Sequence, residues 1–206
     1  MFKTASIALA ATAAVGLAAC SPPNQQDSTM PATSSPSAMP GMSDHNMPGT
    51  SIAPAANFND ADVMFLQMMY PHHAQAVDMA KLVPTRSQNQ QVKDLASAIE
   101  GAQAPEMQQM TVLLASFGKP APSATMDHSM SGMMTPQQMT DLQGLSGPAF
   151  DKMWLQMMID HHQGAITMSD DELKNGTNPD VKKMAQAIVT AQQGEIDKMK
   201  GMLAGM

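Results

Sequence analysis

The amino-acid sequence predicts an all-α protein whose folded part is a four-helix bundle built from two duplicated helical hairpins. The first observation is an internal duplication: residues 62–114 and 151–203, offset by 89, are identical without gaps at 21 of 53 positions. The second is that apolar residues recur in each copy with the period of an amphipathic helix. The third is that no stretch alternates polar and apolar residues with the period of a strand over a useful length.

The first copy predicts two helices joined by a short turn. Asn59 or Asp60 is a suitable N-cap for a helix that we expect to end near Leu82. Residues 84–90 form the turn, and a second helix runs over about 91–117. Gly118, followed by a proline two residues later, is a typical helix stop.

The second copy predicts the same arrangement, preceded by a short helix over about 136–145. Thr135 is the cap of that short helix and Pro136 its first residue. Long helices follow over about 148–173 and 179–204, with a turn over 174–178. Because neither hairpin can bury its own apolar stripe, we expect residues 58–206 to form one bundle domain with a single core. The hairpins span 58–118 and 135–206, and the linker spans 119–134.

The amino terminus has the pattern of an export signal. Lys3 precedes a short alanine-rich apolar run that is too short to span a membrane. Leu17-Ala18-Ala19-Cys20 resembles a bacterial lipobox, which implies a signal peptide over 1–19 and lipidation of Cys20. The alternative is an ordinary signal with an unrelated cysteine. Residues 20–57 are rich in Ser, Pro and Thr and are expected to be a disordered tether. The chain would then be lipid-anchored in the bacterial envelope, in the periplasm and at the outer membrane.

Composition excludes several classes of function. The formal net charge of −7, with one Trp and one Tyr, makes a nucleic-acid partner a poor expectation. A single cysteine excludes an intramolecular disulfide and a thiolate metal cage. Methionine is the anomaly, at 24 of 206 residues. Core packing explains methionines on helices, but it does not explain those in the tether and the linker.

Each copy carries a His-His pair among methionines on one predicted helix. Thioether sulfur favours Cu(I), imidazole also binds copper, and a zinc site would normally bring more His, Cys or carboxylate. We therefore predict Cu(I), with silver as a second possible ion, as the ligand; the alternative is a set of buried, hydrogen-bonded histidines. The candidate ligands on the helices are His72, His73, Met68, Met69 and Met79 in the first copy, and His161, His162, Met157, Met158 and Met168 in the second.

The tether and the linker repeat the same ligand types at short spacing, and the next helix of each hairpin carries a carboxylate. The alternative for the short segments is unstructured polar filler. Glu106 and Glu195 share otherwise apolar helix faces with Gln103 and Gln192, so they either orient a histidine ring or form an ordinary salt bridge. The candidate ligands outside the helices are Met42, His45 and Met47, then Met126, His128 and Met130.

With these residues in place, the chain resembles the domain-of-unknown-function family 305. The motif Met-Met/Ile-x-x-His-His-x-x-Ala-hydrophobic-x-Met on one helix, followed by Ala-x-x-Ile-x-x-x-Gln-x-x-Glu on the next, occurs here over 68–79 and 96–106, and again over 157–168 and 185–195. The resemblance implies a ferritin-like four-helix bundle exported from a bacterial cell. Some members of the family are linked to binding of copper and silver and to metal resistance.

The sequence therefore predicts an exported protein that binds Cu(I) for buffering, transfer or resistance, with a copper-export or chaperone protein as a possible partner. Two other hypotheses stay open. One is a copper-dependent envelope oxidoreductase, although no nucleophile, di-iron Glu-x-x-His motif or zincin motif accompanies the histidines. The other is a structural envelope module whose methionines only pack or scavenge oxidants.

Overall fold

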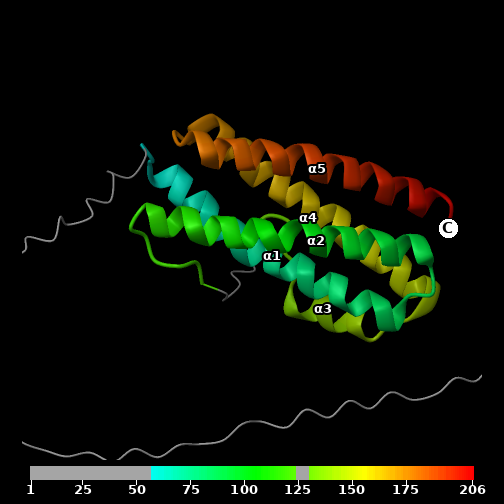
Figure 1. The fold of residues 1–206 in the computed structure, drawn as a ribbon. Helices are drawn as coiled ribbons and strands as arrows, with labels where there is room; N and C mark the ends of the chain where they lie inside the picture. Colours follow the sequence, from blue (N-terminus) through cyan, green and yellow to red (C-terminus); the bar gives the residue numbers. More distant parts are fainter. Residues whose placement is uncertain (1–56, 124–129) are drawn as a thin grey trace, which may run out of the picture. The chain divides into compact units, whose positions relative to one another are not determined.

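Five helices and no strand make up the residues that the computed structural model describes, which are 57–123 and 130–206 (Figure 1). This confirms the all-α class and the two helical hairpins. The leader, most of the tether and the centre of the linker lie outside the described residues. The helices are α1 (Asp60–Arg86), α2 (Gln90–Ser116), α3 (Pro136–Gln143), α4 (Gly147–Asn175) and α5 (Pro179–Ala204).

The end of α1 differs from the sequence prediction. The helix continues four residues beyond Leu82 and includes Pro84, which we expected to open the turn. A proline lacks its own N–H but leaves the donors that follow it intact. The N–H of Ser87 accordingly still donates to the carbonyl of Val83 at 2.9 Å, and the last turn closes. The other long helices begin and end within two residues of the predicted positions.

Side-chain caps begin four of the five helices. Asn59 caps α1 in a capping box with Asp62, and Thr135 caps α3 in another. Asn89 and Asn178 accept backbone N–H groups at the starts of α2 and α5. Gly118, with φ at +66°, follows the end of α2 in the left-handed conformation that glycine favours. The two caps predicted from the sequence, at Asn59 and Thr135, therefore occur at the starts of α1 and α3.

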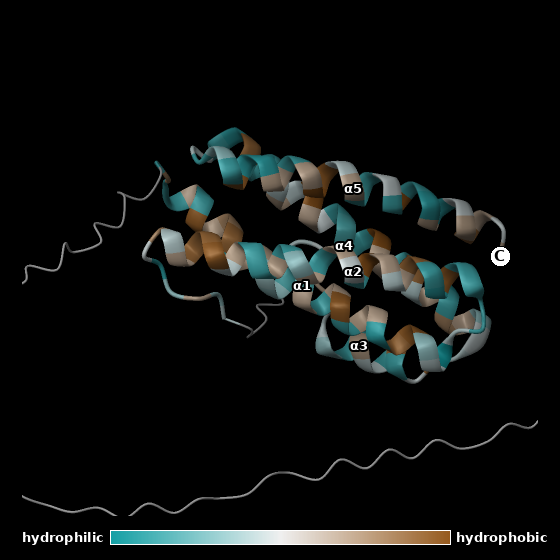
Figure 2. Cartoon of the chain, in the orientation of Figure 1, coloured by the Kyte–Doolittle hydropathy of each residue, from teal (hydrophilic) through white to brown (hydrophobic). Residues whose placement is uncertain are grey.

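The two hairpins pack through their first helices. α1 pairs with α2 and α4 pairs with α5, while α1 and α4 also pack against each other. Figure 1 shows α2 and α5 running along the outside of this pair, with the short α3 beside the end of α1. Hydrophobic and hydrophilic residues recur along each long helix in Figure 2, as amphipathic helices require.

The core consists of two apolar clusters separated by a polar layer. One cluster contains Trp154 and Phe150 with the C-terminal half of α1, and the other contains Phe65 with the C-terminal half of α2. Between them, at the middle of each long helix, lies a buried polar layer. This layer consists of His72 and His73 of α1, Gln103 and Glu106 of α2, His161 and His162 of α4, and Gln192 and Glu195 of α5.

A buried carboxylate joins the start of α1 to the turn between α4 and α5. The side chain of Asp62 accepts the N–H groups of Asn59 at 2.7 Å and Asn178 at 2.9 Å, as well as that of Thr177. Burial acts to raise the pKa of Asp62, but these donors, together with a hydrogen bond from the Glu172 carboxyl group, outweigh it and hold the pKa below its usual value. Burial, together with the neighbouring Asp62 carboxylate, raises the pKa of Glu172 to about 8.

The end of the linker, Met130–Met134, lies directly on the bundle. Gln75 of α1 fixes it in both directions, because its amide donates to the carbonyl of Met134 at 2.9 Å and accepts the N–H of the same residue at 2.7 Å. Gly164 of α4 permits close backbone approach here, since a Cβ at this position would overlap the carbonyl of Ser131. We call residues 130–134 the strap.

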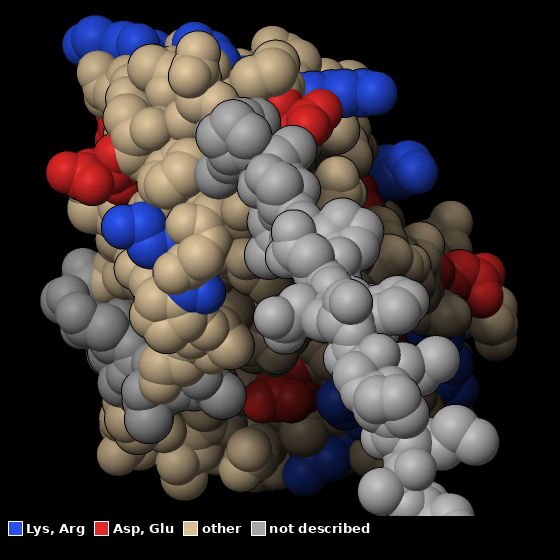
Figure 3. Space-filling model, turned by 60° about the vertical axis from the view of Figure 1, so that its left-hand side comes forward, with Lys and Arg blue, Asp and Glu red and all other residues tan. Residues whose placement is uncertain are grey.

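The surface of the bundle carries mixed charge. On the face shown in Figure 3, acidic and basic side chains of the described residues are interspersed between uncharged ones. Among the helices that the structure describes, none has the length and apolar character needed to cross a membrane.

We predict that Gly164→Ala destabilises the protein. The new methyl group would meet the backbone of the strap rather than a movable side chain, so the strap or α4 must shift. Overpacking of this kind typically costs about 1–3 kcal/mol. Chemical unfolding followed by circular dichroism would measure the change.

Gly101→Ala is the matched control. Gly101 is also a glycine within a helix, but a Cβ there would meet nothing within 4 Å. Because alanine is the better helix former, this variant should gain roughly 0.5–1 kcal/mol. Equal effects of the two substitutions would show that the strap does not pack on Gly164.

Candidate metal centre

The four helical histidines meet at the crossing of α1 and α4. All four are completely buried. The rings of His72 and His161 have their centroids 3.8 Å apart, at 41° between their planes. The two members of a pair are one residue apart and therefore point about 100° apart around the helix. One member of each pair thus faces the opposite hairpin, and the other faces its own.

The outward members of the pairs make matching contacts within each hairpin. His73 Nε2 lies 2.7 Å from Glu106 Oε2, and His162 Nε2 lies 2.7 Å from Glu195 Oε2. Since a carboxylate oxygen accepts, the ring nitrogen donates in each case. Each glutamate is only partly exposed, so the pairs lie at the edge of the core. This is the kind of contact by which a carboxylate fixes the orientation and tautomer of a ligating histidine.

The inward histidines leave ring nitrogens without partners. His72 Nε2 lies 3.2 Å from the carbonyl oxygen of Ser131 in the strap. A carbonyl can only accept, so Nε2 carries the hydrogen and Nδ1 carries a free lone pair. His161 has no hydrogen-bond partner on either ring nitrogen. The Nδ1 atoms of His73 and His162 are buried and unpartnered as well. A buried acceptor without a donor is costly, and these lone pairs are suited to ligating a metal ion.

Burial keeps the inward histidines uncharged. It lowers the pKa of His72 to about 3, with a further contribution from the charge of His73. The pKa of His161 is also well below its usual value, first because of burial and then because of His72. Both rings are therefore neutral near pH 7. Neutral imidazole is the form that binds a metal ion.

Gln103 and Gln192 complete the polar layer from the outer helices. Both side chains are almost fully buried. Neither amide nitrogen nor oxygen of Gln103 has a hydrogen-bond partner, and Gln192 Oε1 has none. They lie on the same helix faces as Glu106 and Glu195, but Gln103 makes no hydrogen bond to a histidine.

The methionines of the two motifs fall into two groups. Those buried in the core are Met69, Met79, Met157 and Met158. Met68 and Met168 are half-buried and line a surface pocket instead. Met130, in the strap, is buried. The remaining candidates from the sequence lie outside the described residues: Cys20, Met42, His45, Met47, Met126 and His128.

Carboxylate and imidazole groups alone do not form a metal cage here. Within residues 57–123 and 130–206, no three or more His, Cys, Asp or Glu side chains are grouped so that they could hold a metal ion. A site centred on His72 and His161 therefore needs its further donors from thioethers, or an ion that accepts few ligands. Both conditions fit a soft monovalent ion better than zinc.

Sequence reasoning missed the strap and its contacts. Ser131 has no side-chain role at the site; its backbone carbonyl contacts His72. Gln75 and Gly164 occupy equivalent positions in the two copies, yet one fixes the strap and the other makes room for it. A glycine in mid-helix was the only available signal of a close approach.

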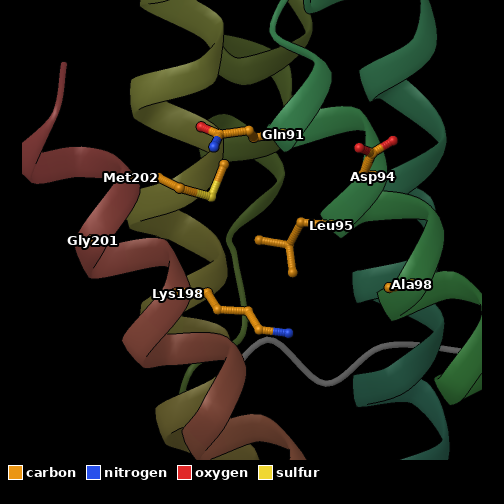
Figure 4. A pocket seen from close by; sticks show the side chains of 7 residues that line it. All are labelled: Gln91, Asp94, Leu95, Ala98, Lys198, Gly201 and Met202. Carbon is orange, nitrogen blue, oxygen red and sulfur yellow. The ribbon is translucent and has the colours of Figure 1, made fainter.

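One of the surface pockets lies away from the histidines. It is an open groove of about 490 Å³ between α2 and α5, lined by Leu95, Met202 and Lys198 among others (Figure 4). No histidine lines it. The groove offers no arrangement of nucleophile and base, and we assign it no chemistry.

Fold and site together define a duplicated helical bundle with a buried histidine layer. The family model of the domain of unknown function DUF305 matches residues 62–203, and the chain belongs to this family. A DUF305 fragment from Deinococcus radiodurans is 35% identical with a TM-score of 0.68, covering 74% of this chain and 100% of its own. A family member from Streptomyces coelicolor, presumed to be secreted, is 31% identical with a TM-score of 0.66, covering 70% and 93%.

The bundle is also similar to CopM, whose structure is known with bound metal. The Cu(I)-bound form of CopM is 29% identical with a TM-score of 0.59, covering 70% of this chain and 96% of that one. CopM has also been solved with Cu(II) and with silver. An uncharacterised protein of Acanthamoeba polyphaga mimivirus, L153, is 42% identical over 53 residues. That match spans 26% of this chain and 35% of the viral protein.

We predict that the metal-free protein loses stability in acid through His72 and His161. Their pKa values are lower in the folded chain than the value of about 6.5 in the unfolded chain. The folded state therefore binds fewer protons, so the contribution is full above pH 6.5 and falls as the pH drops. Each histidine can cost up to about 1.4 kcal/mol per pH unit.

Urea unfolding of the native chain and of His72→Gln/His161→Gln at pH 7.5 and 5.5 measures this. The native chain should lose more stability between the two pH values than the variant. The raised pKa of Glu172 affects both chains equally and cancels in the comparison. Parallel losses in the two chains would mean that the inward histidines are protonated in the fold.

Proposed function

We propose that this protein binds Cu(I), and also Ag(I), at the buried histidine layer, and buffers the ion or hands it on outside the cytoplasm. The observation that carries the proposal is the set of buried, neutral ring nitrogens without hydrogen-bond partners where α1 meets α4. CopM, which shares the fold and has been solved with bound Cu(I) and silver, also supports the proposal.

The donor set explains the preference for a soft ion. His72 and His161 would supply imidazole nitrogen, and the methionines of the two motifs that are buried in the core would supply thioether sulfur. None of these donors carries a charge, so the site would stabilise a divalent ion poorly within a low-dielectric core. Cu(I) and Ag(I) carry a single charge and favour soft ligands.

The glutamates would act through the outward histidines. Glu106 and Glu195 accept from His73 and His162, and this hydrogen bond orients each ring and makes its other nitrogen a stronger donor. Gln103 and Gln192 lie in the same layer and would help to hold it. The short Met/His segments around His45 and His128 would add capture sites of lower order; both lie outside the described residues.

Export and lipid anchoring are part of the same proposal. The leader over 1–19 and the lipobox-like sequence before Cys20 support them. A tether over 20–57 would hold the bundle away from the membrane, where it could exchange Cu(I) with a copper-export or chaperone protein. No histidine lines the groove between α2 and α5 or the pocket at Met68 and Met168, which favours a carrier over a copper oxidoreductase.

A Cu(I) competition titration against a chromophoric chelator, under anaerobic conditions, tests the copper proposal. The native chain should withdraw Cu(I) from the chelator. His72→Gln/His161→Gln should weaken the bundle site by roughly 100-fold or more, because it removes two ligands. Glu106→Gln/Glu195→Gln should weaken it by about 10–100-fold, the usual effect of losing the partner of a ligating histidine.

The matched control is Gln108→Glu/Gln193→Glu, which changes charge at exposed positions of α2 and α5 outside the polar layer. It should titrate like the native chain. If the native chain left the chelator unchanged, the copper proposal would be wrong, and the methionines and histidines would serve packing alone.

Fractionation of bacteria that express the full chain tests the lipid anchor. The native protein should partition with the membranes, and Cys20→Ala should not, because the only thiol available for lipidation is gone. Ser21→Ala is the control and should stay with the membranes. Membrane association of Cys20→Ala would contradict lipidation.

A further inference from the structure

A surface pocket of about 310 Å³ lies where α1 begins and α4 ends, away from the histidine layer. Three methionines line it: Met64 and Met68 from α1 and Met168 from α4. Met64 is 55% exposed and is among the few large apolar side chains that the described residues leave in solvent. The thioether of Met64 is therefore accessible to an ion from solvent.

The same pocket is lined by a buried carboxyl group. Glu172 is only 2% exposed, and no donor reaches its oxygens; in its protonated form its own hydrogen is shared with Asp62. The Glu172 carboxyl group fits here because residue 176 is a glycine; a Cβ on Gly176 would overlap it. Its charged neighbours are the carboxylate of Asp62, which also accepts backbone donors, and the ammonium of Lys182. A carboxyl group buried beside a second carboxylate is costly to ionise, and a bound cation would compensate for that negative charge.

The duplication provides an internal comparison. The offset of 89 relates Met64, Met68 and Met168 to Met153, Met157 and Met79, so both halves of the bundle carry the three methionines. The carboxylates occur in one half only. Val83 and Leu82 stand at the positions equivalent to Glu172 and Asp171, and buried Phe150 stands where the pocket has Ala61. At the end of the bundle that contains Val83 and Phe150, apolar core residues occupy these positions. At the end that contains Glu172, the equivalent positions line an open, acidic pocket.

We propose that Met64, Met68, Met168 and Glu172 form a second site for a soft monovalent cation, Cu(I) or Ag(I), distinct from the histidine layer. The thioethers supply soft donors, and the carboxylate supplies one negative charge against the single positive charge of the ion. The ion replaces the proton that the carboxyl group holds in the ion-free chain. Asp171, on the rim of the pocket, adds attraction for cations. The inference rests on the proposed function only in the choice of ion.

The position of the second site suits it to pass the ion from solvent to the histidine layer. Met68 is one helical turn before His72, and it also lines a neighbouring pocket with Met130 of the strap. The second site is therefore open to solvent on one side and adjoins the covered histidines on the other. It would receive the ion first and release it more readily than the buried layer.

Titration of the full chain with Ag(I), which needs no reductant, tests the proposal. With methionine labelled by ¹³C at the methyl group, the signals of Met64, Met68 and Met168 should shift on binding. Met64→Leu/Met68→Leu/Met168→Leu should lose about one equivalent of Ag(I) by calorimetry. Met107→Leu/Met139→Leu/Met202→Leu, which changes three half-buried methionines elsewhere, should lose none.

Glu172→Gln keeps the shape of the side chain and removes its charge. It should weaken Ag(I) binding at this site by roughly tenfold or more while leaving the methionines in place. Unchanged affinity in Glu172→Gln would overturn the site as proposed. This measurement stays informative even if the triple leucine variant folds poorly.

His72→Gln/His161→Gln separates this inference from the proposed function. In that variant the methyl signals of Met64 and Met168 should still shift with Ag(I). If the native chain binds Ag(I) but these signals never move, the second site is wrong and the histidine site stands. If the native chain binds neither Ag(I) nor Cu(I), both proposals fail.

Discussion

The contact between His72 and His161 is the constraint on which the rest of the structure depends. Two neutral imidazoles lie against each other where α1 and α4 cross, with an apolar cluster on either side. Polar groups at the centre of a core are costly unless they are bonded. On the outer helices, Glu106 and Glu195 accept hydrogen bonds from the neighbouring His73 and His162. In the strap, the carbonyl of Ser131 accepts a hydrogen bond from His72. The nitrogens that remain are the basis of the proposed metal chemistry.

The duplication relates the two halves of the bundle, but equivalent positions differ, among them those at the strap and near the ends of α1 and α4. Gln75 and Gly164 occupy equivalent positions in the two copies but act differently. Gln75 hydrogen-bonds the strap, whereas Gly164 lacks a side chain and so lets the strap approach α4. Glu172 in one half is matched by Val83 in the other. A duplicated chain thus keeps one central polar layer while its two ends diverge. Divergence of this kind would give the two proposed sites different exposure to solvent.

The fold was predictable because its signals are local. Helix period, caps such as Asn59 and Thr135, and the repeat itself determine the helices and their pairing. The predicted end of α1 was wrong because Pro84 was expected to open the turn. A proline in the last turn of a helix removes only one backbone hydrogen bond, so the helix can continue past it. The strap was not predictable, since Ser131 acts through its backbone, which no residue type signals. The metal ligands stay predictions, because thioether geometry depends on packing that the sequence does not specify.

The central claim is that imidazole and thioether together hold the ion in the bundle. Copper K-edge X-ray absorption of the full chain loaded with one equivalent of Cu(I) tests it most directly. The account predicts a low-coordinate Cu(I) with both nitrogen and sulfur neighbours, and with the outer-shell scattering that identifies imidazole rings. Nitrogen neighbours should be lost from the variant lacking His72 and His161. A spectrum with sulfur alone in the native chain would contradict the account and leave the histidine layer as a structural feature.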